Sequence, residues 1–210
     1  QNLTANGPRP TGSPACVAAA EYIYNQFENM GLSVRYAPWS NGGYNSNNVE
    51  ATLNGTDGTS DDIYIICGHY DTVSAGPGAD DDTSGTAAVL TAASIMSQYQ
   101  FNHTIKFVTF SGEEQGLLGS AVYATDAANQ GWNIVGVLNC DMISYAITTN
   151  DGNNLDVIEN TASEWLYTYT ADISTEYAEY IQLTLVHYGY MWGSDHNSFW
   201  DEGYDAVFYF

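Results

Sequence analysis

The chain has 210 residues, of which 44% are hydrophobic, and this suits one globular domain with a full core rather than a disordered protein. Its 25 acidic residues face only three cations, Arg9, Arg35 and Lys106, so the formal net charge is −22. This charge argues against nucleic acid as a partner, because phosphate contacts need lysine and arginine, and no apolar run is long enough to span a membrane.

The first predicted elements in chain order are a helix and two strands. The helix signal is the apolar spacing of Val17, Ala20, Tyr24 and Phe27. Gly31 is expected to end this helix, because glycine is the usual residue just beyond a helix C-terminus. Strands are predicted over LSVRYAP (32–38) and NVEATL (48–53), with the loop NGGYNSN (41–47) between them.

From residue 63 onward, strand and helix patterns alternate along the chain. Predicted strands cover 63–70, 104–111, 134–142, 155–159, 182–188 and 206–210, and predicted helices cover 83–99, 117–129 and about 161–178. This alternation predicts an α/β fold of three layers, α/β/α, with a mainly parallel mixed central sheet that is covered on both faces. Ligands of such sheets bind beyond the carboxyl ends of the strands, so the residues that follow each strand are the candidates for chemistry.

His69 and Asp71 follow the buried strand IYIIC, in the motif GHYDT (68–72). Extended residues two positions apart point to the same side, so the Asp71 carboxylate can accept a hydrogen bond from the far ring nitrogen of a metal-bound His69. Such a bond fixes the tautomer and raises the basicity of the imidazole. The alternative is a surface histidine beside one of many acids, and the pair alone does not decide between the two.

Acidic residues also follow the next two central strands. Glu113 and Glu114 come after TIKFVTF and project differently, so one can bind a cation while the other takes a proton from water. Their alternative is the acidic first turn of the following helix. Asp141 ends an otherwise apolar strand, where a carboxylate is costly to bury unless it is paired or bound to a cation; its alternative is a helix or loop cap.

Together with Asp80, Asp81 and Asp82 of the loop GADDDTSG (78–85), these strand ends form one candidate constellation. One histidine and several carboxylates suit Zn²⁺ or a comparable divalent ion, and a shared carboxylate can bridge two ions. No GxSxG nucleophile elbow follows a strand, and the glycine loop carries acids where a phosphate site needs amides and lysine. A metal centre is therefore the favoured interpretation.

Four motifs follow one another in the chain: GHYDT (68–72), PGADDDTSG (77–85), SGEEQGLLGS (111–120) and LNCDM (138–142). In this order and spacing they resemble the co-catalytic dizinc aminopeptidases of metallopeptidase clan MH, which include bacterial leucyl aminopeptidases and aminopeptidase Y-like enzymes. The segments RPTGSPACVAAAEYI and NVEATLNGT are also similar to that family, so the resemblance covers nearly the whole chain. It implies the zinc-dependent exopeptidase fold, a single peptidase domain over 1–210, and release of N-terminal residues from peptides.

The resemblance implies a role for each matching residue. Glu113 matches the general base and proton shuttle, and Asp71 matches the partner that orients the histidine ligand. The peptide bond between Asp81 and Asp82 is often cis in this family. Asp81 is the implied bridge between two zinc ions, and Asp80 is the member of the triplet expected to be replaceable. The implied metal ligands are His69, Asp81, Glu114 and Asp141.

One feature of the family is missing from the sequence. Its last histidine ligand lies in a Tyr-His-Thr-x-x-Asp segment beyond a Ser-Asp-His loop. Here GSDHNSF (193–199) matches that loop, but the chain stops at Phe210 with no later histidine, so we expect a chain that lacks its C-terminal segment and an incomplete second zinc site. The ligands that remain are His69, Asp81 and Asp141 for one ion, and Asp81 and Glu114 for the other.

The remaining histidines and the aromatic residues have less specific interpretations. His196 is interpreted as the wall of a pocket rather than as a ligand, and His103 and His187 as structural or exposed residues. The aromatic stretch YGYMWGSDHNSFW (188–200) either walls a pocket for an apolar first residue of the substrate or forms a core patch at a strand end.

The positions of the cations favour an aminopeptidase over a carboxypeptidase. Arginine or lysine would hold a substrate carboxylate, but Arg9, Arg35 and Lys106 lie outside the motif loops, and a carboxylate-rich site suits a protonated amine. The expected partner is therefore a peptide with a free N-terminus, and the oligomeric state is not predicted. Two alternatives remain, a glutaminyl cyclase that uses a single zinc ion and a non-catalytic binding module on the same fold.

Acidity and cysteine content suggest where the protein works. A surface of this charge repels itself unless salt screens it, so our hypothesis is a secreted or extracellular protein adapted to a saline setting. The chain starts with Gln1 rather than Met, which we interpret as a processed or cut chain without a visible leader. The three cysteines lack the spacing of a metal site, and for Cys67 and Cys140, which lie in apolar runs, free buried thiols are favoured over a disulfide. These cysteines are Cys16, Cys67 and Cys140.

Overall fold

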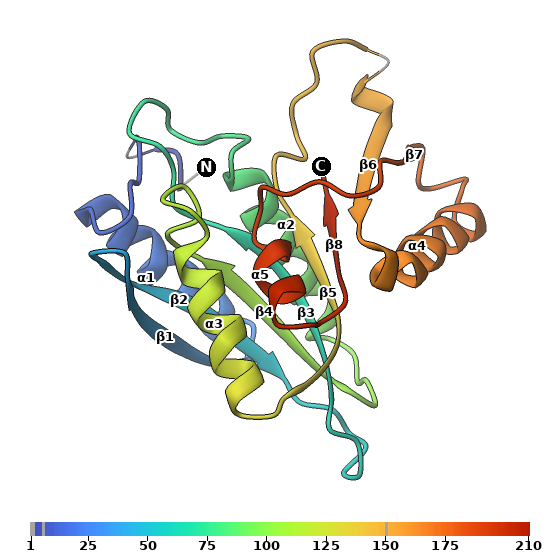
Figure 1. Cartoon of the computed structure of the whole chain (residues 1–210), viewed down its shortest axis with the longest axis horizontal. Helices are drawn as coiled ribbons and strands as arrows, with labels where there is room; N and C mark the ends of the chain where they lie inside the picture. Colours follow the sequence, from blue (N-terminus) through green and yellow to red (C-terminus); the bar gives the residue numbers. More distant parts are fainter. Residues whose placement is uncertain (1–2, 6, 150) are drawn as a thin grey trace.

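The computed structural model describes residues 3–5, 7–149 and 151–210, so the prediction made from Gln1 lies outside the described residues. The structure is one eight-stranded sheet with helices packed against it (Figure 1). The strands are β1 (Ser33–Asn41), β2 (Tyr44–Leu53), β3 (Asp62–His69), β4 (Thr104–Phe110), β5 (Asn133–Cys140), β6 (Asn154–Glu159), β7 (Thr184–His187) and β8 (Ala206–Tyr209). The helices are α1 (Pro14–Asn29), α2 (Thr83–Met96), α3 (Leu118–Asn129), α4 (Glu164–Glu176) and α5 (His196–Asp201). Short 3-10 turns lie at Asp151–Asn153 and Thr161–Ser163.

The strand order across the sheet is β1-β2-β4-β3-β5-β8-β6-β7. The four central strands β4, β3, β5 and β8 run parallel to one another, while β2 is antiparallel to β4 and β6 is antiparallel to β8. This confirms the predicted α/β fold with a mixed sheet, in which antiparallel pairs join both flanks to the parallel centre. Because parallel strands end at the same edge, the residues that follow β3, β4 and β5 are brought together there.

Each face of the sheet has its own hydrophobic core, because successive residues of a strand point to opposite faces. Ile65 and Cys67 of β3 pack in a cluster with residues of α3 and α5, whereas Ile66 packs in a second cluster with residues of α1 and α2. A smaller third cluster joins Leu166 of α4 to Val207 of β8. Figure 1 shows α3 and α5 on the near side of the sheet, with α1 and α2 behind it. Burial of these apolar faces is the main source of stability.

Helix α1 forms as predicted, but its buried face differs from the predicted one. The Ser13 side chain caps the first turn by accepting a hydrogen bond from the backbone N–H of Cys16 at 3.1 Å, and Gly31 lies just beyond the end with φ of 78°. Val17, expected in the core, is 61% exposed. The buried face consists of Cys16, Ala19, Ala20, Ile23 and Phe27.

Two segments predicted as loops are regular structure. In residues 41–47, β1 and β2 form a hairpin in which Asn41 pairs with Tyr44, and only Gly42 and Gly43 turn, both with positive φ. Glycine reaches that region without steric cost, which allows the tight turn. The segment that begins at His196 forms the short helix α5, and most of its polar side chains are buried.

The three cysteines are free, which confirms the favoured interpretation, with Cys16 and Cys67 buried and Cys140 partly buried. Burial raises the pKa of Cys16 to about 11 and that of Cys140 to about 12, so both are protonated thiols at neutral pH. Among the parts of the chain that the structure describes, no helix combines the length and the apolar character that a membrane crossing needs.

Candidate metal centre

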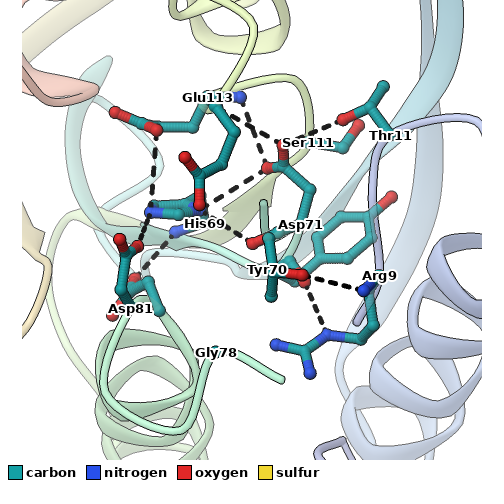
Figure 2. A network of polar contacts seen from close by, with 12 residues as sticks. Arg9, Thr11, His69, Tyr70, Asp71, Gly78, Asp81, Ser111 and Glu113 are labelled. Carbon is teal, nitrogen blue, oxygen red and sulfur yellow. Dashed lines mark hydrogen bonds and ion pairs between the residues drawn. The ribbon is translucent and has the colours of Figure 1, made fainter. Parts of the chain in front are cut away.

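The candidate site lies at the carboxyl edge of the central strands, and four separate segments build it; Figure 2 shows three of its residues, His69, Asp81 and Glu113. His69 is the last residue of β3, and Asp81 lies in the loop between β3 and α2. Glu113 and Asp141 follow β4 and β5, both of which pair with β3. The parallel pairing therefore places the ends of three strands side by side, as the sequence predicted.

The Nε2 atom of His69 is the centre of this group. It lies 3.2 Å from Asp81 Oδ1, 3.6 Å from Asp141 Oδ1 and 3.9 Å from Glu113 Oε2. The His69 side chain is 1% exposed, whereas that of Asp81 is 42% exposed. The group is thus buried on one side and open to solvent on the side of Asp81.

Two facing atoms of this group, His69 Nε2 and Asp141 Oδ1, are buried and have no hydrogen-bond partner within the described ranges. Buried polar atoms are nearly always hydrogen-bonded, whereas these two atoms have only ion-pair contacts, so a cation held between them would give both a partner. Ligand atoms of His69, Glu113 and Asp141 all lie within 4.8 Å of one another. One imidazole nitrogen with carboxylate oxygens at this spacing is a donor set that fits zinc.

Asp71 contacts His69 in a different way from the one predicted. The Nδ1 atom of His69 lies 3.2 Å from the backbone carbonyl oxygen of Asp71 and 3.5 Å from its Oδ1, so the carbonyl is the closer partner. The buried Asp71 carboxylate accepts hydrogen bonds from Thr11 Oγ1 at 2.8 Å and from the backbone N–H groups of Glu113 and Glu114 at 3.3 and 3.4 Å. Asp71 therefore orients the imidazole mainly through its backbone, and its side chain holds the segment that carries Glu113.

Asp82 differs from its neighbour Asp81 in being wholly buried. Its carboxylate accepts hydrogen bonds from three backbone N–H groups, those of His69 (3.1 Å), Gly85 (2.7 Å) and Met142 (3.3 Å). It thereby caps α2 and ties this helix to the ends of β3 and β5. The peptide bond between Asp81 and Asp82 is cis, as the resemblance implied.

Asp80 and Glu114 lie at the edge of the group. Asp80 Oδ1 accepts hydrogen bonds from the backbone N–H and the hydroxyl of Ser144 at 2.8 and 2.9 Å, so it connects the loop before α2 to the loop after β5. Glu114 Oε1 accepts a hydrogen bond from the backbone N–H of Val73 at 2.8 Å. Glu114, a predicted ligand, is therefore next to the three-residue donor set of His69 rather than part of it.

The pKa values reflect the crowding of carboxylates around one imidazole. Burial by itself would lower the pKa of His69, but its contacts with Asp141, Asp71 and Asp81 raise that pKa well above the usual value. Burial raises the pKa of Glu113 to about 9, although the charge of His69 acts in the opposite direction. For Asp141, burial would raise the pKa, but its contacts with His69 and Ser194 lower it below the usual value. Glu113 is thus the carboxylate that lacks positive charge, and a bound cation would favour its ionised form.

Asp195 is a buried acid near the group that the sequence interpretation missed. Neither of its carboxylate oxygens has a hydrogen-bond partner among the described residues, and burial raises its pKa to about 7. The preceding Ser194 donates a hydrogen bond from its hydroxyl to Asp141 Oδ2 at 2.7 Å. Both residues belong to GSDHNSF (193–199), and this motif is the signal that could have identified them.

The other histidines lie outside the group. His196, predicted to wall a pocket, is instead completely buried between the rings of Trp200 and Phe208, whose centroids lie 4.4 and 4.9 Å from its own. Burial lowers the pKa of His196 to about 4, so its ring is neutral at pH 7. His103 and His187 are partly exposed and each pairs with one acidic residue, as expected for structural or exposed histidines.

Known proteins share sequence with this chain. The model of peptidase family M28 matches residues 48–210, which is more than half of the chain. A probable zinc metalloprotease of Pyrenophora tritici-repentis is 39% identical over 104 residues, which cover 46% of this chain and 21% of that protein. The match therefore spans about a fifth of the length of this curated relative.

Solved structures share the fold over nearly the whole chain. The LapA aminopeptidase of Legionella pneumophila is 26% identical with a TM-score of 0.81, over 99% of this chain and 57% of that chain. The glutaminyl cyclase of Fimbriiglobus ruber is 21% identical with a TM-score of 0.79, over 99% of this chain and 80% of that chain. The second similarity is a similarity of fold alone.

Proposed function

Because the chain belongs to peptidase family M28, we propose that it is a zinc-dependent aminopeptidase, which hydrolyses the peptide bond after a free N-terminal residue. The observation that carries this proposal is the buried pair His69 Nε2 and Asp141 Oδ1, which have no hydrogen-bond partner among the described residues and lie within 4.8 Å of a ligand atom of Glu113. A metal-binding donor set and a carboxylate base in one group are what metal-assisted hydrolysis requires.

His69, Asp81 and Asp141 would hold one zinc ion, and Asp81 and Glu114 would hold a second. When bound, zinc supplies a Lewis acid that polarises the scissile carbonyl and makes a water molecule more acidic. Glu113 takes a proton from the attacking water and delivers it to the nitrogen of the leaving amine. The exposed side of Asp81 leaves the group open for the substrate to approach.

The distribution of charge supports recognition of the amine end of a peptide. The chain has three cations, and all are engaged in the fold. Arg9 is buried and bonded to neutral oxygen atoms, while Arg35 and Lys106 both contact Glu50 at 2.6 Å. None is free to bind a substrate carboxylate at the His69 group, whose own carboxylates attract a protonated amine.

Exposed apolar side chains close in sequence to residues of the group support an apolar first residue of the substrate. Tyr190 and Trp192 are 68% and 63% exposed, and they come shortly before Ser194, which contacts Asp141. Met142, which directly follows Asp141, is also partly exposed. Apolar walls beside a few polar groups are typical of small-ligand sites.

The proposal can be tested with two matched substrates. The zinc-loaded protein should hydrolyse leucine p-nitroanilide and leave N-acetyl-leucine p-nitroanilide intact, because only the first presents a protonated amine. A chelator should abolish the activity, and added zinc should restore it. Equal rates on the two substrates would contradict an aminopeptidase.

The same assay separates the two alternatives. A glutaminyl cyclase, favoured by the fold similarity, would convert a peptide with N-terminal glutamine into its pyroglutamyl form without hydrolysis. A non-catalytic module would contain no zinc in elemental analysis and would turn over neither substrate.

The net charge of −22 supports, as a further part of this proposal, secretion into a saline environment. Salt screens the repulsion among surface carboxylates, so the melting temperature should rise as NaCl is added. A melting temperature that falls with NaCl would contradict this adaptation.

A further inference from the structure

Arg9 is a buried cation in the coil that precedes α1, and it reaches over the carboxyl edge of β3 (Figure 2). It is 1% exposed. Its guanidinium group makes four hydrogen bonds: Nε to Tyr70 O (2.9 Å), Nη1 to Leu3 O and to Pro77 O (2.8 Å each), and Nη2 to Thr83 Oγ1 (2.9 Å). A guanidinium has five N–H groups in a fixed plane, so four of them are used here.

Three of these acceptors belong to the segment that carries Asp81. Tyr70 lies at the start of that segment, Pro77 in its middle, and Thr83 is the first residue of α2. The backbone of Arg9 is fastened to the same segment, because its N–H donates to Thr72 Oγ1 at 2.8 Å and its carbonyl accepts from Thr72 N–H at 3.2 Å. One side chain thus holds both ends and the middle of the loop.

The charge of Arg9 has no direct partner among the described residues, because all four acceptors of its guanidinium are neutral oxygen atoms. A buried cation without a close carboxylate is costly, and an apolar residue would stabilise a core better. The carboxylates of Asp71 and Asp82 attract it from a longer distance. The free-energy cost of burying Arg9 has an explanation if its planar guanidinium donors are needed to hold the loop between β3 and α2 in one conformation.

A second residue of the same coil holds the other part of the site. Thr11 is buried and donates a hydrogen bond to Asp71 Oδ2 at 2.8 Å. Asp71 in turn accepts the backbone N–H groups of Glu113 and Glu114. The coil therefore contacts both sides of the donor set, although it lies before residue 48, where the family match begins.

We propose that Arg9 is a positioning residue of the metal centre, which clamps the loop between β3 and α2 so that Asp81 Oδ1 stays beside His69 Nε2. The inference rests on the proposed binding of zinc by these residues. Arg9 touches neither the metal nor the substrate in this role. It acts through the shape of the loop, and the residues matched by the family model do not include it.

The test compares Arg9→Lys with Arg35→Lys. The first variant keeps the charge but replaces the fork of donors by a single ammonium, while the second makes the same change at Arg35, a half-exposed cation paired with Glu50. Folding of both variants is checked by circular dichroism and thermal melting in EDTA. Zn²⁺ affinity is then measured by competition with a chromophoric chelator, and the visible spectrum is recorded after loading with Co²⁺.

Folded Arg9→Lys should bind Zn²⁺ about 10- to 100-fold more weakly than wild type, as is usual when a partner behind the metal ligands is changed. Its Co²⁺ spectrum should also change, and Arg35→Lys should match wild type in both measurements. A folded Arg9→Lys with wild-type affinity and spectrum would overturn the inference alone. A wild-type protein that binds no Zn²⁺ would overturn the proposed function and this inference together.

If Arg9→Lys does not fold, Thr83→Val decides the question. This nearly isosteric change removes the hydroxyl that accepts from Arg9 Nη2 and donates to Gly78 O, and it leaves Arg9 in place. Zn²⁺ affinity should then fall by about fivefold, the equivalent of one hydrogen bond. Unchanged affinity in the folded variant would refute the clamp.

Discussion

The protein buries carboxylates in two regions, and the two regions treat them in opposite ways. Glu50 of β2 is 2% exposed, and both of its oxygens receive hydrogen bonds. The donors are Arg35 Nη2 (2.6 Å), Lys106 Nζ (2.6 Å), Tyr123 OH (2.8 Å) and Thr52 Oγ1 (3.2 Å). At the metal centre, by contrast, several carboxylates share the single imidazole of His69, and Asp141 Oδ1 has no hydrogen-bond partner within the described ranges.

The pKa values of two glutamates express this difference. Burial by itself would raise the pKa of Glu50, but Arg35, Lys106 and the Tyr123 hydroxyl lower it to about 2. Burial raises the pKa of Glu113 to about 9, because the charge of His69 offsets only part of its effect. Glu50, which the chain supplies with cations, contributes to folding stability. Glu113, which has too little positive charge near it, marks a place where a cation from outside the chain can bind.

The largest effect is expected from Glu113→Gln, which removes the proposed base but keeps its shape. Turnover of aminoacyl p-nitroanilides should fall by about 10²- to 10⁴-fold, because a positioned proton-transfer group contributes that much to a rate. Zinc content should stay at the wild-type value. Stability of the metal-free protein should not fall, because the pKa of about 9 keeps Glu113 neutral at pH 7, as glutamine is.

Steady-state kinetics, elemental analysis and urea unfolding measure the three quantities separately. Retained turnover would refute the role of Glu113 as base. A loss of zinc together with turnover would instead assign Glu113 as a ligand, in keeping with its place in the donor set with His69 and Asp141.

The same substitution at Glu50 should affect stability and leave the chemistry unchanged. Ionised Glu50 contributes stability that is fully present above its unfolded pKa of 4.5 and is lost as the pH falls through its folded pKa of about 2. One pKa unit corresponds to about 1.4 kcal/mol, so the lowering of the Glu50 pKa from 4.5 to about 2 corresponds to about 3 kcal/mol of folding stability. The variant Glu50→Gln should lose this stability at pH 7.

Urea unfolding of both proteins in EDTA, from neutral pH to acid, checks this expectation. The difference in unfolding free energy between wild type and Glu50→Gln should shrink as the pH falls below 4.5. A difference that does not depend on pH would show that packing rather than charge is lost. Turnover per folded molecule should equal that of wild type.

The core of the fold could be predicted because its central strands are apolar and alternate with helices. One error falls where polar residues have partners that only the fold reveals. In α5, Asn197 Oδ1 accepts the backbone N–H of Gly193 at 2.7 Å, and the hydroxyl of Ser198 lies 2.8 Å from that of Ser120. A short polar segment with such bonds can be buried, although its composition is typical of a loop.

The candidate site could be predicted where its residues lie at or just beyond the ends of strands, as His69, Glu113 and Asp141 do. Arg9 and Thr11 could not be assigned to it, because their partners Tyr70 and Asp71 are 61 and 60 positions away and no motif spacing connects them. The Asp71 carboxylate stays 3.5 Å from His69 Nδ1, but its hydrogen bonds with two backbone N–H groups could not be predicted for the same reason, since only folding brings those groups close.

The smallest effect, and the most direct test of the difference between the two regions, is expected from Asp141→Asn. Zinc at about 100 times its dissociation constant should stabilise the wild-type protein by about 2.7 kcal/mol, and the variant should lose most of this gain with its charged ligand. Without metal, the variant should lose no more than about 1 kcal/mol of unfolding free energy. His69 keeps its contacts with Asp71 and Asp81, and the new amide oxygen can still accept a hydrogen bond from Ser194.

Urea unfolding with and without zinc measures both values. Equal stabilisation of the two proteins by zinc would place the cation elsewhere, and a large loss in the metal-free variant would make Asp141 a structural charge like Glu50.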